Sequence, residues 1–126
     1  MESGEVMLVD SHCHLNYDGL VEHIPDVIRR ADEAGVSHMV CICSRLEEFE
    51  AVAQIADSHD NVFCTVGIHP HDCGNEAETD VETLIDLANH PKTIGIGETG
   101  LDFFYDNSPR EIQERNFRTH IGAARK

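Results

Sequence analysis

Two histidines near the start of the chain have a spacing that suits metal binding. They stand in the segment Asp10-Ser11-His12-Cys13-His14, in a chain with nine histidines among 126 residues. In an extended backbone, residues two apart face the same side, so we expect His12 and His14 to project together, with Asp10 beside them. Two neutral imidazoles at this separation can chelate one divalent ion. The alternative interpretation is a pair of ordinary surface histidines on a loop.

A second histidine-rich segment closes an apolar run further along the chain. It reads Gly67-Ile68-His69-Pro70-His71-Asp72. His69 stands one step beyond the apolar run, where it could reach a substrate or a metal-bound water. For His71 and Asp72 a solvated loop, with Pro70 fixing the turn, is the competing interpretation.

A glutamate follows two glycines in the segment Gly95-Ile96-Gly97-Glu98-Thr99-Gly100. The letters match the dinucleotide fingerprint G-x-G-x-x-G, but that fingerprint must open a helix, whereas these glycines end a strand-like run and precede a loop. We expect Gly95 and Gly97 to thin the strand so that Glu98 can enter a crowded site. There Glu98 could bridge two divalent ions, as in two-metal hydrolysis. An exposed loop glutamate is the alternative.

The cysteines do not have the spacing of a disulfide scaffold or of a closed zinc site. The chain has five, an odd number: Cys13, Cys41, Cys43, Cys64 and Cys73. Closed zinc sites use C-x₂₋₄-C spacing, whereas Cys41, Cys43 and Cys64 lie in apolar runs where small buried residues are common. The sequence therefore predicts reduced thiols, which are typical of a cytosolic protein.

The elements that must position these residues are short strands that alternate four times with amphipathic helices. The strands are predicted over 6–10, 38–43, 62–68 and 93–97. The first helix carries apolar residues at helical spacing and ends at Gly35. Capping boxes predict where the other three helices begin, the last with proline at its first helical position: Ser44 to Glu47, Thr79 to Glu82, and Ser108 to Glu111 with Pro109. The fourth helix is the least amphipathic.

Strands separated by single helices predict an α/β fold with parallel pairing and right-handed crossovers. All three polar segments then lie at the carboxyl ends of strands, where such folds bind ligands. Four βα units are half of an eightfold barrel, which needs about 250 residues. The chain forms either a small open sheet or a piece of something larger. Its final residues continue a helical pattern without a terminating Gly or Pro, which favours the larger assembly.

The composition is that of an acidic globular protein. Nine Lys and Arg face 24 Asp and Glu, a formal charge of −15, and 40% of the residues are hydrophobic. No apolar run approaches the ~20 residues that a membrane span needs, and the acidic start is unlike a secretory signal. We therefore expect a cytoplasmic protein without membrane contact. The charge also excludes a basic nucleic-acid-binding surface, so a phosphate partner would need a metal to receive it.

Taken in order, three segments resemble the TatD-type metal-dependent deoxyribonucleases, relatives of the amidohydrolases. They are Val9-Asp10-Ser11-His12-Cys13-His14-Leu15, Val66-Gly67-Ile68-His69-Pro70-His71-Asp72 and Gly95-Ile96-Gly97-Glu98-Thr99-Gly100-Leu101-Asp102, with a further similar stretch over 113–123. The resemblance implies a TIM-like (β/α)₈ barrel, of which residues 1–126 would be the N-terminal portion. It also implies hydrolysis of DNA phosphodiester bonds with two divalent ions, which could be Zn, Mn, Fe or Mg.

By this resemblance, the metal ligands are His12, His14 and Glu98, with Glu98 bridging the ions, and the catalytic residues are Glu98 and His69. Asp102 and Tyr105 would lie near the pocket. The family's further ligands, two histidines and an aspartate from later strands, would lie beyond Lys126. Asn16 departs from the pattern, since many members have Asp there. We further expect the Asp10 carboxylate to accept a hydrogen bond from a ligating histidine, at the ring nitrogen that does not bind the metal.

Three functions stay open. The first is a DNase domain with DNA as substrate, either a fragment or completed by another chain. The second is an ester or amide hydrolase of the same fold, for instance on aminoacyl-tRNA esters, because an activated water attacks either kind of centre. The third is a non-catalytic, metal-binding half-barrel or an inactive truncated product. Four strands with open edges also predict self-association.

Overall fold

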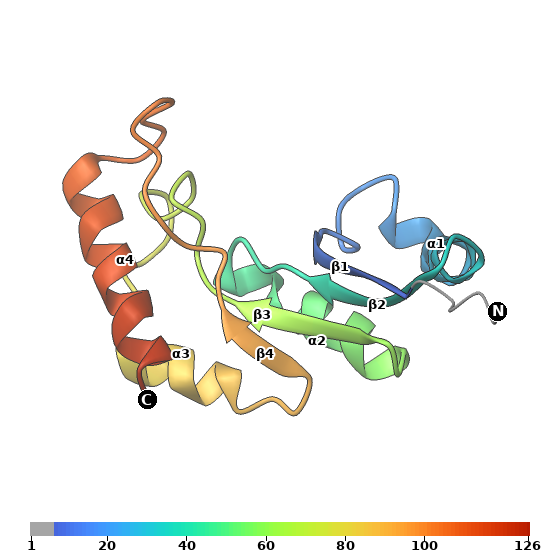
Figure 1. Cartoon of the computed structure of the whole chain (residues 1–126). Helices are drawn as coiled ribbons and strands as arrows, with labels where there is room; N and C mark the ends of the chain where they lie inside the picture. Colours follow the sequence, from blue (N-terminus) through green and yellow to red (C-terminus); the bar gives the residue numbers. More distant parts are fainter. Residues whose placement is uncertain (1–6) are drawn as a thin grey trace, which may run out of the picture.

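The computed structural model describes residues 7–126 and contains four βα units in sequence (Figure 1). The strands are β1 (Leu8–Cys13), β2 (Val36–Cys41), β3 (Val62–Val66) and β4 (Thr93–Ile96). The helices are α1 (Ile24–Glu33), α2 (Phe49–Ser58), α3 (Val81–Ala88) and α4 (Arg110–Ala124), with short 3₁₀ helices at Val21–His23 and Leu46–Glu48. The predicted alternation is confirmed. The predicted start of the first strand, at residue 6, lies outside the described residues.

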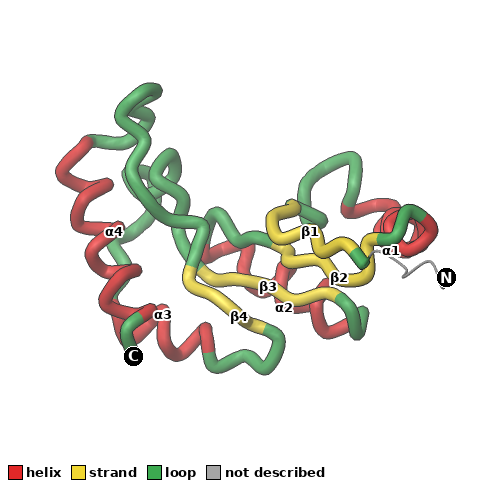
Figure 2. The backbone as a smooth tube through the Cα atoms, viewed as in Figure 1, coloured by secondary structure: helices red, strands yellow, loops and turns green. Residues whose placement is uncertain are grey.

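The four strands form one parallel sheet in the order β1-β2-β3-β4, so β1 and β4 are its two edges. Helix α1 packs on β2, α2 on β3, α3 on β3 and β4, and α4 on α3 and β4. The loops that follow β3 and β4 run together beside α4, at the end of the sheet where the strands finish (Figure 2). This arrangement brings the three polar segments to one end of the molecule.

The core lies between the sheet and its helices. Its fully buried side chains include Val52, Val62, Val66 and Leu84, and three cysteines stand side by side in the register, with Cys13 opposite Cys41 and Cys41 opposite Cys64. All five cysteines are free thiols, as predicted. Burial raises the pKa of the Cys43 thiol to about 11, which keeps the free thiol protonated and unreactive at neutral pH.

Several predicted strand boundaries shift by one to three residues, the largest shift being at β1, which ends at Cys13 rather than at residue 10. The first helix ends as expected, with Gly35 at a φ of 87°. Strand β2 begins at Val36 and ends at Cys41, two residues earlier than predicted at both ends. Ile42 and Cys43 remain buried after the strand has ended, so hydrophobicity alone cannot locate its end.

Two predicted capping boxes are wrong. The cap of α3 is Asp80 rather than Thr79, and its carboxylate accepts from the Thr83 N–H at 2.8 Å. Helix α2 begins only at Phe49, after a 3₁₀ turn, and has no side-chain cap. The Ser44 hydroxyl instead bonds to the Tyr17 hydroxyl at 3.0 Å, because a partner distant in sequence competes for it.

Within residues 7–126, no helix has the length and apolar character needed to cross a membrane.

Candidate metal centre

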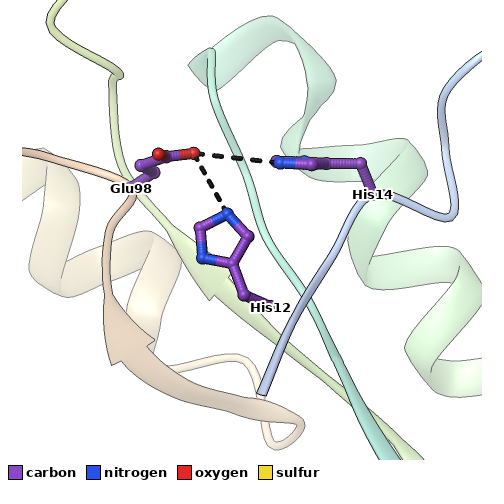
Figure 3. A group of neighbouring side chains, drawn as sticks. All are labelled: His12, His14 and Glu98. Carbon is purple, nitrogen blue, oxygen red and sulfur yellow. Dashed lines mark ion pairs between the residues drawn. The ribbon is translucent and has the colours of Figure 1, made fainter. Parts of the chain in front are cut away.

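Three of the predicted ligands meet at the carboxyl end of the sheet. His12 and His14 come from the end of β1, and Glu98 comes from the loop after β4 (Figure 3). Nε2 of His12 lies 3.5 Å from Oε2 of Glu98, and Nε2 of His14 lies 3.9 Å from the same oxygen. One ligand atom from each residue lies within 4.8 Å of the other two. Two ligands about 2.1 Å from one tetrahedral ion lie roughly 3.4 Å apart, so these separations fit a shared ion.

Strand β1 positions the two histidines. It stays extended through Cys13, so His12 and His14 point to the same side, as their spacing predicts. The expected role of Asp10 differs in the structure. Its Oδ1 accepts from the backbone N–H of His12 at 3.1 Å. Asp10 therefore holds the backbone at His12 and does not hydrogen-bond an imidazole ring. The short side chain reaches its local amide before it can reach a ring.

A backbone carbonyl sets the orientation of His14. Its Nδ1 lies 3.2 Å from the Ile42 carbonyl, which only accepts, so Nδ1 carries the proton and the Nε2 lone pair faces Glu98. The Tyr17 ring stacks on the imidazole at 4.4 Å and limits its rotation. Metal-binding histidines are commonly held in this way. A lone pair facing a carboxylate oxygen is repulsive without a cation between them, so the donor set fits a divalent ion.

The loop after β4 carries Glu98 across the end of the sheet. The Glu98 N–H donates to the Cys43 carbonyl and the Gly97 N–H to the Val66 carbonyl, both at 2.8 Å. A Cβ on Gly67 would lie 2.7 Å from the Gly97 carbonyl carbon, so this crossing requires glycine at 67. The predicted reason for Gly95 and Gly97 is wrong, because a Cβ at either position would meet its nearest neighbour at an ordinary distance, 3.5 Å and 3.8 Å.

His69 reaches the same carboxylate from the other side. Its Nδ1 accepts from the His71 N–H at 2.9 Å, so in the neutral ring Nε2 carries the proton. Nε2 lies 3.4 Å from Oε1 of Glu98, the oxygen turned away from His12 and His14. His69 therefore faces Glu98 as a proton donor, beside the ligand set rather than within it. Whether it is catalytic stays a prediction.

A histidine and an aspartate form a pair next to His69. The His71 ring packs edge-on against the His69 ring at 4.4 Å, and its Nε2 bonds to Oδ2 of Asp102. This bond and the backbone N–H groups of Tyr105 and Phe104 lower the pKa of the Asp102 carboxyl. His71 thus ties the loop after β3 to the loop after β4, which its interpretation as a solvated loop residue did not anticipate.

The sequence prediction missed the buried polar face of α4, formed by Gln113, Asn116 and His120, whose exposed fractions are 0%, 5% and 1%. Oε1 of Gln113 accepts from the Asp102 N–H at 2.7 Å. Nδ2 of Asn116 donates to the Ile68 carbonyl at 3.0 Å, and Nε2 of His120 accepts from the Ile68 N–H at 2.9 Å. Helix α4 therefore holds both site loops through their backbones.

This polar face has a signal in the sequence. Gln113, Asn116 and His120 are spaced i, i+3 and i+7, the spacing of one helical face. A search for apolar periodicity overlooks it and finds only a weakly amphipathic helix. A search for buried polar periodicity would have found it.

The third predicted capping box is also wrong. Pro109 occupies the cap position of α4, and the Ser108 side chain does not cap the helix. The Ser108 hydroxyl donates to the His71 carbonyl at 3.0 Å and accepts from the Gly74 N–H at 2.9 Å. It therefore joins the two site loops.

The chain is similar to several known proteins. The family model for TatD-related DNases matches residues 9–126. The chain is 32% identical over 119 residues to the uncharacterized metal-dependent hydrolase YabD of Bacillus subtilis, covering 94% of this chain and 47% of that protein. It is 37% identical over 92 residues to the 3'-5' ssDNA/RNA exonuclease TatD of Shigella flexneri, covering 73% and 35%.

A solved structure has the same fold. The crystal structure of YJJV, a TatD homologue from Escherichia coli K12, matches with a TM-score of 0.85 at 24% identity, over 93% of this chain and 46% of that chain. The predicted fold, parallel βα units of a TIM-like barrel, is confirmed. The chain spans less than half the length of each of these three proteins.

Proposed function

Because this chain belongs to the TatD-related DNase family of metal-dependent hydrolases, we propose that it supplies part of a two-metal site that hydrolyses phosphodiester bonds of DNA. One observation carries the proposal: His12, His14 and Glu98 converge from opposite edges of the sheet on one point. The exonuclease name of the Shigella relative supports a nucleic-acid substrate. When bound, divalent ions would activate a water for attack on phosphorus and neutralise phosphate oxygens.

The chain's own residues have distinct roles in this proposal. His12 and His14 offer neutral nitrogens, and the Ile42 carbonyl holds His14 in the tautomer that leaves Nε2 free. The two oxygens of Glu98 face different partners, Oε2 toward these histidines and Oε1 toward His69. A carboxylate presented in this way is suited to bridging two ions. His69 keeps a proton at Nε2, where it can hold the carboxylate or donate to a substrate oxygen.

Metal-titrated hydrolysis by the purified protein tests this function. A 5'-labelled single-stranded DNA oligomer and an aminoacyl ester are each incubated with Mg²⁺, Mn²⁺, Zn²⁺ or Fe²⁺. We expect metal-dependent cleavage of DNA, at a rate that falls at least about a hundredfold in Glu98→Gln. Loss of a residue that only hydrogen-bonds a metal ligand already lowers metal affinity or activity by about 10–100-fold. The exposed Glu111 provides the matched control, Glu111→Gln.

Two results would contradict the proposal. Cleavage of DNA at an unchanged rate in Glu98→Gln would show that another site acts. Hydrolysis of the ester without cleavage of DNA would assign the centre to ester substrates instead. Calorimetric titration of Mn²⁺ into both variants separates loss of metal binding from loss of chemistry.

A further inference from the structure

Three consecutive aromatic residues stand on the loop between β4 and α4. Phe103, Phe104 and Tyr105 have exposed fractions of 37%, 87% and 64%. Phe104 is thus more exposed than any other large hydrophobic side chain in residues 7–126. Clustered exposed apolar side chains usually mark a binding surface.

A row of rings joins this aromatic loop to the candidate metal centre. His69 faces Glu98, and its ring lies 4.4 Å from that of His71. The His71 ring lies 5.7 Å from that of Tyr105, which lies 4.8 Å from that of Phe104. The row therefore runs outward from the ligand set and ends at the exposed Phe104 ring.

The aromatic loop is held in place by hydrogen bonds. Oδ1 of Asp102 accepts from the N–H groups of Phe104 and Tyr105, both at 3.1 Å. Gln113 accepts from the Asp102 N–H and donates to the Asp102 carbonyl. The exposed rings thus stand on a backbone that is already ordered, which reduces the entropy lost when a ligand binds.

We propose that the exposed Phe104 ring, supported edge-on by the Tyr105 ring at an interplanar angle of 85°, forms a stacking platform for a base of single-stranded nucleic acid whose phosphate is bound at the metal centre. This inference rests on the proposed function and adds the residues that would bind a base of its substrate. Stacking on aromatic rings tolerates any base. The two carboxylates that flank this loop are already paired, Asp102 with His71 and Asp106 with Arg110. The platform requires single strands, because base faces in a duplex are covered by their neighbours.

Binding of oligomers with and without bases tests the platform. The probes are a fluorescent thymidine decamer and an abasic decamer of the same length, both with phosphorothioate links to resist cleavage, in Mn²⁺. The purified protein should bind the thymidine decamer more tightly than the abasic one. Phe104→Ala should weaken binding of the thymidine decamer by about fivefold to a hundredfold, the range for loss of one stacked base, and leave binding of the abasic decamer unchanged.

Three further variants separate stacking from general apolar contact. Phe104→Trp keeps an aromatic face and should bind the thymidine decamer at least as well as the unchanged protein. Phe104→Leu keeps an apolar side chain without a ring and should behave like Phe104→Ala. Ile94→Ala removes an exposed apolar side chain from β4, away from the aromatic loop, and should change nothing.

Cleavage of ordinary, hydrolysable forms of both decamers distinguishes failure of the platform from failure of the proposed function. If the unchanged protein cleaves the thymidine decamer but Phe104→Ala binds that decamer as tightly as the unchanged protein does, the platform alone is overturned. Binding that depends on Phe104 without hydrolysis by any variant would overturn the proposed function alone. Equal affinity of the unchanged protein for both decamers, or no binding of either, would also overturn the platform.

Discussion

Truncation of His120 tests whether α4 holds the candidate site together. The ring is 1% exposed, and its Nε2 accepts from the Ile68 N–H, one residue before His69. In His120→Ala this buried N–H loses its acceptor, which costs roughly 1–3 kcal/mol. The cavity left by the ring adds about 2 kcal/mol. We therefore expect the free energy of unfolding to fall by about 3–5 kcal/mol.

A conservative variant isolates the hydrogen bond. In His120→Gln the side-chain oxygen can take the position of Nε2 and accept from Ile68, so the expected loss is only about 1–1.5 kcal/mol. The affinity for Mn²⁺ should follow the same order, because Ile68 leads directly to the residue that faces Glu98. Arg118→Ala, at an exposed position of α4, is the control and should change stability by less than about 0.5 kcal/mol.

The pH dependence of stability provides a second measure of the same ring. Burial lowers the pKa of His120, so it stays neutral in the fold at a pH where the unfolded chain is protonated. Its contribution to stability is therefore complete above the unfolded pKa of about 6.5 and is lost as the pH falls toward the lower folded pKa. Gln does not titrate. The free energy by which the unchanged protein is more stable than His120→Gln should therefore shrink by up to about 1.4 kcal/mol when the pH falls from 7.5 to 5.5.

Urea unfolding followed by circular dichroism at both pH values measures these differences. Equal stability of His120→Ala and His120→Gln would refute the proposed bond to Ile68. A stability difference between the unchanged protein and His120→Gln that does not depend on pH would refute the neutral buried ring.

Three other predictions follow from the geometry. Gly67→Ala should displace the loop that carries Glu98 and weaken Mn²⁺ binding by at least about tenfold in calorimetry, whereas Gly95→Ala should leave it unchanged. Val9 on the edge strand β1 has an exposed fraction of 59%, so we expect the chain to self-associate through this edge. Sedimentation should show self-association at micromolar concentration, and Val9→Lys should reduce it. A version extended to about 250 residues should bind metal more tightly and cleave DNA faster than the 126-residue chain, because later strands can add ligands; equal rates would contradict this.

The fold could be predicted because each βα unit has its own periodic pattern. Alternating β-branched runs and helical apolar faces required no knowledge of distant contacts. The errors occurred where distant partners decide local structure. Ser44 and Ser108 stand in sequence patterns typical of helix caps. In the structure the Ser44 hydroxyl bonds to Tyr17, and the Ser108 hydroxyl bonds to the loop after β3. A sequence pattern does not encode this competition.

The convergence of His12, His14 and Glu98 could be predicted for a topological reason, whereas their role as metal ligands stays a prediction. In a parallel sheet every strand ends on the same side, so His12, His14 and Glu98 had to share one end of the molecule. Their convergence across the sheet depends on backbone bonds, such as that from Glu98 to Cys43, which no side-chain motif indicates. The DNA substrate, the second ion, the cytoplasmic location and self-association remain predictions.

The charge of the chain gives the metal centre a further role. Four arginines already face carboxylates: Arg29 with Asp26 and Glu33, Arg45 with Glu47 and Glu48, Arg110 with Asp106, and Arg115 with Glu78.

A chain of charge −15 repels a polyanion at long range, and these four arginines are already engaged with carboxylates. Two neutral imidazoles and one carboxylate carry a single negative charge, so one divalent ion reverses the sign of the centre. In the proposed function, metal binding would then precede substrate binding as well as chemistry, because only the loaded centre would attract a phosphate.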